Sequence, residues 1–243
     1  MKELIALTSA KHAPGVTSAA VALAIAAGPI PASLLVEADP AGGDLAARCE
    51  LSVEPGLGSL AASGRHGAPV ELADHVQSLP AGPFGLLAPP SPSLTRSALA
   101  ALGGRLADGL GAWAGTVVVD CGRWDPSGPA VALATVADAL LVVLRPTVEG
   151  VEHVRARLDD LRSVGAARVA ALLVGDRPYP PADVAAALGI PVAGVLPLDP
   201  RGAKALERRM LGAETRRSTI VRAARSTLDV ITTAPAQRTE LRP

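Results

Sequence analysis

The chain has 243 residues, 49% of them apolar and four of them aromatic, and its formal net charge is zero. This length fits one α/β domain, and a core of Ala, Val and Leu is typical of parallel strands covered by helices. So few aromatic side chains argue against a stacking surface for single-stranded nucleic acid. Two cysteines, no signal-peptide layout and no apolar run of about 20 residues predict a cytoplasmic protein without a disulfide framework or a membrane span.

Short β-rich apolar runs alternate with helical patterns along the chain, which predicts a parallel sheet. The expected strands are residues 3–9, 33–39, 84–89, 116–120, 139–144, 169–175 and 192–197. The expected helices, several of them opened by Pro or Thr and closed by Gly, are residues 16–27, 94–113, 148–164, 181–189 and 201–210. The predicted fold class is therefore α/β, a doubly wound and mostly parallel sheet with helices on both faces.

The pattern predicts a single domain over residues 1–231. Within it, residues 53–93 are rich in Pro, Gly and Ser, and we expect a looped excursion there with one short helix around residues 70–79. The polar end of the chain, residues 232–243, is expected to be a disordered tail.

Residues 10–18, AKHAPGVTS, follow the first strand and precede a helix, which is the placement of a phosphate-binding loop. The Walker A pattern G-x-x-x-x-G-K-[ST] uses glycines to wrap the phosphates, the Lys to neutralise their oxygens and the hydroxyl to hold Mg²⁺. Ala10 stands in place of the first Gly and Val16 in place of the Lys, whereas Gly15 and Thr17 are kept. A strand-to-helix turn that binds no ligand is the alternative interpretation of this loop.

The loop KHAPGVTS resembles the KGGVGKTT loop of the MinD/ParA family. The run LLVEADPAGGDL resembles the family's switch segment D-x-D-P-Q-G-G, and TVVVD resembles its Walker B strand. Two later segments, ADALLVVLRPTVEGVEHV and GIPVAGVLPLDPRGAKAL, resemble the strands and helices that follow. The resemblance covers residues 3–212 and implies a P-loop NTPase fold of the MinD/ParA type.

The resemblance also implies a site for ATP and Mg²⁺. Lys11 falls on the family's signature lysine, which reaches the nucleotide of the partner subunit, so a homodimer is implied with Lys11 and Asp39 as catalytic residues. Mg²⁺ would be held by Thr17, Asp39 and Asp120, and Glu37 matches the family's other acid. The nucleotide-binding residues implied are Lys11, His12, Ala13, Pro14, Gly15, Val16, Thr17, Ser18 and Pro197.

Several departures from the family pattern bear on activity. Pro14 removes a backbone donor, and Val16 removes a full positive charge, so we expect a slow ATPase at best. Gly175 stands where the family usually reads adenine with an Asn, which leaves the choice of nucleotide open.

These features predict a nucleotide-binding dimeric switch or scaffold. The eroded loop resembles the TadZ/CpaE branch of the family, which implies a role in positioning a pilus or secretion apparatus through a protein partner. A nucleotide-independent pseudo-ATPase scaffold is one alternative. The other is a ParA-like chromosome or plasmid partitioning protein that binds DNA nonspecifically.

The partitioning alternative depends on the basic end of the chain. Residues 201–225 carry eight Arg or Lys against two Glu, and a solvated helical face is the simpler explanation for them. If they bind DNA, the contacts are to phosphates, and the candidate residues are Arg216, Arg217 and Arg222.

Overall fold

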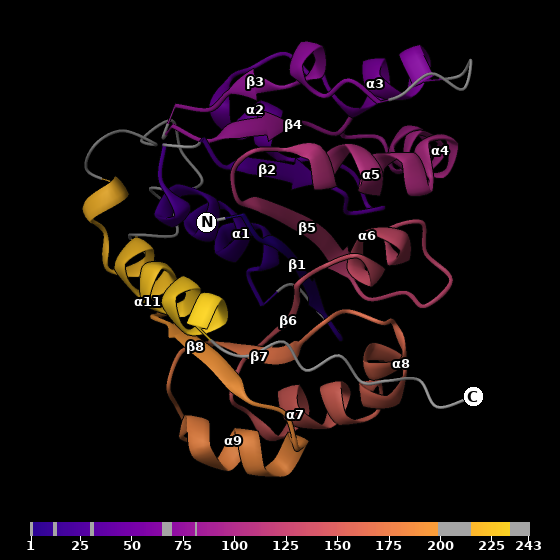
Figure 1. The fold of residues 1–243 in the computed structure, drawn as a ribbon. Coiled ribbons are helices and arrows are strands. Elements are labelled where there is room, and N and C mark those ends of the chain that lie inside the picture. The colour runs from indigo at the N-terminus through magenta and orange to yellow at the C-terminus, as the bar shows by residue number, and fades with distance from the viewer. Residues whose placement is uncertain are drawn as a thin grey trace.

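The computed structural model describes residues 2–11, 14–29, 32–64, 70–80, 82–198 and 215–233. Within these residues the chain forms one eight-stranded sheet covered by helices (Figure 1). The strands are β1 Leu4–Ser9, β2 Leu34–Glu37, β3 Gln77–Ser78, β4 Phe84–Leu86, β5 Val117–Arg123, β6 Ala139–Leu144, β7 Val169–Val174 and β8 Val192–Leu196. The helices are α1 Val16–Ala27, α2 Leu45–Cys49, α3 Leu57–Ser63, α4 Pro92–Leu102, α5 Gly104–Ala112, α6 Val131–Thr135, α7 Val148–Arg155, α8 Leu158–Ser163, α9 Pro181–Leu188 and α11 Thr219–Thr233, with 3-10 turns η2 Ala73–His75 and η3 Thr215–Arg217.

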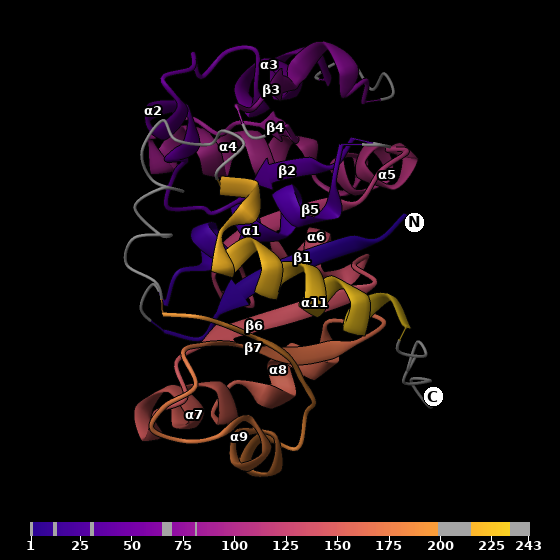
Figure 2. The ribbon, with the colours of Figure 1, turned by 90° about the vertical axis from the view of Figure 1, so that its left-hand side faces the viewer.

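The sheet runs in the order β3-β4-β2-β5-β1-β6-β7-β8, and neighbouring strands are parallel except for the pair β3 and β4. Helices α1, α2 and α11 pack on one face, and the helices from α3 to α9 pack on the other. Figure 2 shows α11 lying across the sheet on the same side as α1. This arrangement confirms the predicted doubly wound α/β fold.

The central strand β1 shows why the strands could be predicted from the sequence. Leu4 and Ala6 join the core on one face, whereas Ile5 and Leu7 join the core on the other. Because both faces are covered, residues 4–7 are all apolar and the strand reads as a continuous apolar run before Thr8 and Ser9. All seven predicted strands are present, with ends that differ by a few residues at most.

Two of the predicted helices are each broken in two. The helix expected over residues 94–113 is α4 followed by α5, because Gly103 takes a non-helical conformation with φ 51° and ψ −136°. The helix expected over residues 148–164 is α7 followed by α8, with Arg157 outside the helical region at φ −121° and ψ 6°. The helix expected over residues 201–210 lies outside the described residues.

Residues 53–93 hold more regular structure than the expected loop. They contain α3, η2 and the antiparallel strand β3, and Nδ1 of His75 lies 2.8 Å from Oγ of Ser59. The segment 70–79, where a helix was expected, forms one 3-10 turn and then β3, because its last residues pair with β4. In this segment sheet pairing outweighs local helix preference.

The C-terminal helix α11 continues to Thr233, and the rest of the expected tail lies outside the described residues. None of the helices in the described part of the chain combines the length and the apolar character needed to cross a membrane.

A close contact between β8 and α11 generates a stability prediction. A Cβ at Gly194 would lie 2.9 Å from Cβ of Thr227 and closer still to its hydroxyl, and Thr227 is only 1% exposed. We expect Gly194→Ala to lower the free energy of unfolding by about 1–3 kcal/mol through overpacking. Gly111→Ala, in α5 with open space around it, is the control and should not destabilise. Equal urea midpoints for the two variants would contradict this packing.

Candidate functional site

Buried polar side chains gather where the central strands end. Leu7 of β1 and Glu37 of β2 both lie opposite Asp120 of β5 in the sheet register. Thr8, Glu37 and Asp120 are each no more than 3% exposed. Ligands of open parallel sheets bind outside the carboxyl ends of the strands, and this edge is therefore the candidate site.

The loop between β1 and α1 presents the start of a helix to this edge. Gly15 has φ 104° and ψ 36°, a left-handed conformation that a side chain would strain, and α1 begins at Val16. Among the described residues no side chain caps α1, and its first turn contains no acidic residue. The N–H groups of this turn are therefore positioned to receive an anion.

Asp120 joins this helix to the sheet. Its carboxylate accepts a hydrogen bond from the Thr17 hydroxyl, and its Oδ1 accepts the N–H of Gly122 at 2.9 Å. A hydroxyl and a carboxylate are the oxygen ligands that Mg²⁺ prefers. The structure thus brings together two of the three residues that the resemblance places around the metal.

Asp39 reaches the same region from the end of β2. Its Oδ1 accepts the N–H of Ala41 at 2.8 Å, which holds the carboxylate in an Asx turn. Gly122 faces it with φ 62°, and a Cβ at Gly122 would collide with the Asp39 carboxyl group. A glycine two positions after Asp120 is therefore required for Asp39 to approach.

Glu37 is a structural anchor in this site. Its Oε1 accepts the N–H groups of Asp44 at 2.7 Å and Leu45 at 2.8 Å, and its Oε2 accepts the N–H of Ala88 at 3.0 Å. These bonds hold the start of α2 and the chain after β4 against β2. The carboxylate of Asp44 pairs with Arg48 at 2.9 Å. Glu37 therefore positions the segment between β2 and α2.

The pKa values of all three carboxyl groups are raised, chiefly by burial. Burial raises the pKa of Asp120 to about 6, and the charges of Asp39 and Glu37 add to the rise, while hydrogen bonds from Thr17 and Gly122 oppose it. Burial also raises the pKa values of Asp39 and Glu37. A nearby cation would lower the pKa values of all three carboxyl groups.

The oxygen atoms of Thr17 and Asp120 suit a cation whose remaining ligands come from water or a bound molecule. In the described part of the chain, no group of three or more His, Cys, Asp or Glu side chains could hold a metal ion. Mg²⁺ is usually bound by one or two carboxylates and completes its shell with water and phosphate oxygens. The residues present therefore suit Mg²⁺ together with a phosphate-bearing ligand.

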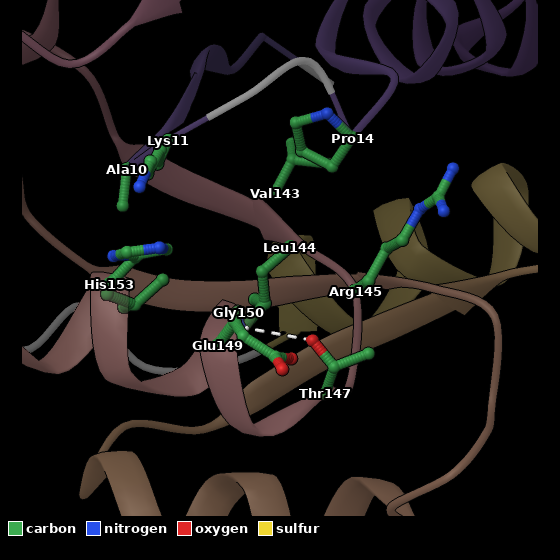
Figure 3. Close-up of a pocket in the computed structure, with 11 residues that line it drawn as sticks. Ala10, Lys11, Pro14, Val143, Leu144, Arg145, Thr147, Glu149, Gly150 and His153 are labelled. Atoms are coloured by element: carbon green, nitrogen blue, oxygen red, sulfur yellow. Dashed lines mark hydrogen bonds between the residues drawn. The ribbon is translucent and has the colours of Figure 1, made fainter.

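A cavity of about 540 Å³ lies between the loop and the start of α7 (Figure 3). This volume is within the range of roughly 300–1,000 Å³ that small-molecule sites occupy. Figure 3 shows Pro14 above it, Lys11 and His153 on one side, and Arg145 on the other. The lining residues are Ala10, Lys11, Pro14, Val143, Leu144, Arg145, Thr147, Glu149, Gly150, His153 and Val154.

A second cavity, of about 410 Å³, lies beside Asp39. Three arginines line it: Arg96 of α4, Arg123 at the end of β5, and Arg157 between α7 and α8. No sequence motif points to these arginines, because they come from segments far apart in the chain.

The remaining predicted residues that the structure describes lie outside both cavities. Ser18 is half-buried in α1, and Pro197 is half-buried directly after β8. Gly175 donates its N–H to the carbonyl of Leu196 at 2.8 Å, so the position of the missing Asn is adjacent to the end of β8. His12 and Ala13 lie outside the described residues.

The basic candidates lie on η3 and α11. Arg217 and Arg222 are exposed, and for Arg216 the structure describes the backbone only.

Solved structures of MinD and ParA proteins share the fold of this chain. The chain aligns over 99% of its length with all of the septum site-determining protein MinD complexed with Mg-ADP from Pyrococcus horikoshii, at 16% identity and a TM-score of 0.78. A ParA family ATPase from Chlorobium tepidum aligns over 96% of this chain and 100% of its own, at 17% identity and a TM-score of 0.76. The MinC:MinD cell division protein complex of Aquifex aeolicus aligns over 96% of both chains, at 14% identity and a TM-score of 0.73.

No protein-family model and no curated protein sequence matches the chain. The strand order and the loop-to-helix turn after β1 define a doubly wound α/β fold of the P-loop NTPase class. More narrowly, the chain has the fold of the MinD/ParA ATPases.

The raised pKa of Asp120 predicts how stability depends on pH. Between about pH 4 and pH 6 the unfolded chain releases this proton while the folded chain keeps it, so stability falls as the pH rises. We expect Asp120→Asn to remove this loss and to raise the free energy of unfolding by about 2–3 kcal/mol at pH 8, with no gain near pH 4. Urea unfolding in metal-free buffer measures both values.

The exposed carboxyl group of Asp108 on α5 provides the control. Asp108→Asn should follow the unaltered protein across the pH range. A gain for Asp120→Asn that is the same at both pH values would show that Asp120 does not titrate as described.

Proposed function

We propose that this chain is a nucleotide-binding switch or scaffold of the MinD/ParA type, which positions a larger assembly in the cell and hydrolyses ATP weakly or not at all. The observation that carries the proposal is the Thr17–Asp120 pair beneath an uncapped helix start. Thr17 and Asp120 would hold Mg²⁺, with Asp39 beside them. The ion would supply charge neutralisation to the phosphates, and the N–H groups at the start of α1 would bind and orient them.

Val16 sets the limit on hydrolysis. Its side chain is 5% exposed and packs in the core beneath α1, so it offers no charge to a ligand. Removing a charged contact from a closed phosphate site costs on the order of 10²-fold or more in rate. Slow turnover is therefore expected even though Asp39 and Asp120 are retained.

Lys11 supports a dimeric form of the switch. Its side chain is exposed and lines the cavity beside the loop, which suits a lysine that reaches the nucleotide of a second subunit. The MinD neighbours are a septum site-determining protein and a protein in complex with MinC, and by analogy this chain would bind a protein partner. The resemblance to the TadZ/CpaE branch favours pilus or secretion machinery as the assembly.

A nucleotide-independent scaffold is the main alternative. Pro14 has no N–H to donate and Val16 has no charge, so the loop has lost two contacts with phosphate. In that case the fold would serve only to present its surface to partners.

Calorimetry with Mg-ATP separates the switch from the scaffold. We expect the unaltered protein to bind Mg-ATP in the micromolar to millimolar range, and Val16→Lys to bind at least about 10-fold more tightly because a charge-assisted bond to phosphate is restored. Val16→Met is the matched control, since it has similar length without charge, and it should not gain affinity.

The scaffold alternative has its own outcome in this experiment. No heat for the unaltered protein up to millimolar Mg-ATP, together with binding by Val16→Lys, would reject the switch. Thermal melting of both variants confirms that each is folded.

The partitioning alternative is favoured only by the exposed arginines of η3 and α11. If it holds, the protein is retained on nonspecific duplex DNA at low salt, and changing Arg217 and Arg222 together to Glu abolishes the retention. Arg155→Glu, on α7, is the control and should remain bound. No retention of the unaltered protein at low salt would eliminate this alternative.

A further inference from the structure

The start of α1 lacks the positive charge that a phosphate site normally has, because the apolar residue Val16 stands in place of the lysine and packs in the core. The other ionisable side chains that line the cavity beside the loop are Lys11, Arg145, Glu149 and His153. Lys11 and Arg145 carry permanent positive charges at neutral pH. A positively charged side chain is therefore present beside the loop although Val16 carries no charge.

The backbone of Arg145 is held in a fixed position at the end of β6. Pro146 follows it, which restricts Arg145 to extended geometry. The carbonyl of Arg145 accepts the N–H of Thr147 at 2.8 Å. A Cβ at Gly150 would collide with this same carbonyl, so the first turn of α7 packs directly against it. The position of the Arg145 Cα, from which its side chain extends, is therefore fixed by these contacts.

The guanidinium of Arg145 is available to a ligand. The side chain is exposed, and within the described residues it makes no hydrogen bond and no ion pair. The nearest acidic lining residue, Glu149, is bonded to its own N–H and to the Thr147 hydroxyl, and these bonds lower its pKa. Figure 3 shows the guanidinium directed away from Glu149, on the side of the cavity where Pro14 lies.

We propose that Arg145 supplies to the phosphates of the bound nucleotide the positive charge that Val16 cannot supply, from the β6–α7 side of the loop. The planar guanidinium offers two parallel N–H donors to phosphate oxygens, which a lysine at the helix start does not. Arg145 is then a determinant of affinity for nucleoside di- and triphosphates. This inference rests on the proposed nucleotide-binding function.

Binding of Mg-ADP and Mg-ATP, measured by calorimetry, tests the proposal. Arg145→Gln should weaken both by about 10-fold to 100-fold, as expected for loss of a charge-assisted hydrogen bond. Arg145→Lys should keep part of the affinity. Arg155→Gln removes the same charge from an exposed position on α7, outside the cavity, and should leave affinity unchanged.

A double variant distinguishes a missing charge from a damaged fold. Val16→Lys combined with Arg145→Gln should bind more tightly than Arg145→Gln alone, because the charge is restored at the usual position. The affinity of the unaltered protein should also fall as salt rises, and less so after Arg145→Gln.

Two outcomes would overturn the proposal in different ways. Equal affinity of the unaltered protein and Arg145→Gln would show that Arg145 does not contact the phosphates, while nucleotide binding itself would stand. Binding by Val16→Lys alone, with none by the unaltered protein, would show that Arg145 does not replace the lysine and would also reject the proposed function.

Discussion

The buried carboxylate of Asp120 is the group on which the candidate site depends. It lies in β5 opposite Glu37, the last residue of β2, and accepts hydrogen bonds from the hydroxyl of Thr17 on α1 and from the N–H of Gly122. Gly122 in turn leaves room for Asp39 from β2. A single buried group thus connects the loop, the sheet and the segment after β2.

Burying Asp120 close to Asp39 and Glu37 is electrostatically unfavourable, and the three acids lie at the strand ends where a ligand is expected to bind. Burial and the neighbouring acids favour the protonated form of Asp120, and water cannot easily relieve the repulsion. Perturbed carboxylates in a cleft are common at sites that bind cations or transfer protons. Glu37 is explained by the backbone bonds that it accepts, whereas Asp39 and Asp120 are the carboxylates that the proposed cation would stabilise.

The sequence predicted the sheet well because both faces of the strands are buried. Each strand appears as a short apolar run, and parallel order forces the segments after β1, β2, β5 and β6 to one edge. This order agrees with the resemblance, which placed Thr17 and Asp120 together around Mg²⁺. The sequence could not predict that the Glu37 carboxylate accepts hydrogen bonds from three backbone N–H groups, because one of them, that of Ala88, comes from a distant segment of the chain. Nor could it place Arg96, Arg123 and Arg157 around one cavity, since tertiary packing alone brings them together.

A crystal structure grown with Mg-ADP is the most direct test of this account. It should show the metal against the Thr17 hydroxyl and the Asp120 carboxylate, and the phosphates against the first turn of α1 with Arg145 within hydrogen-bonding distance. Nucleotide bound elsewhere on the surface, or a site that stays empty at millimolar Mg-ADP, would contradict the central claim that this strand edge is a nucleotide site without its usual lysine.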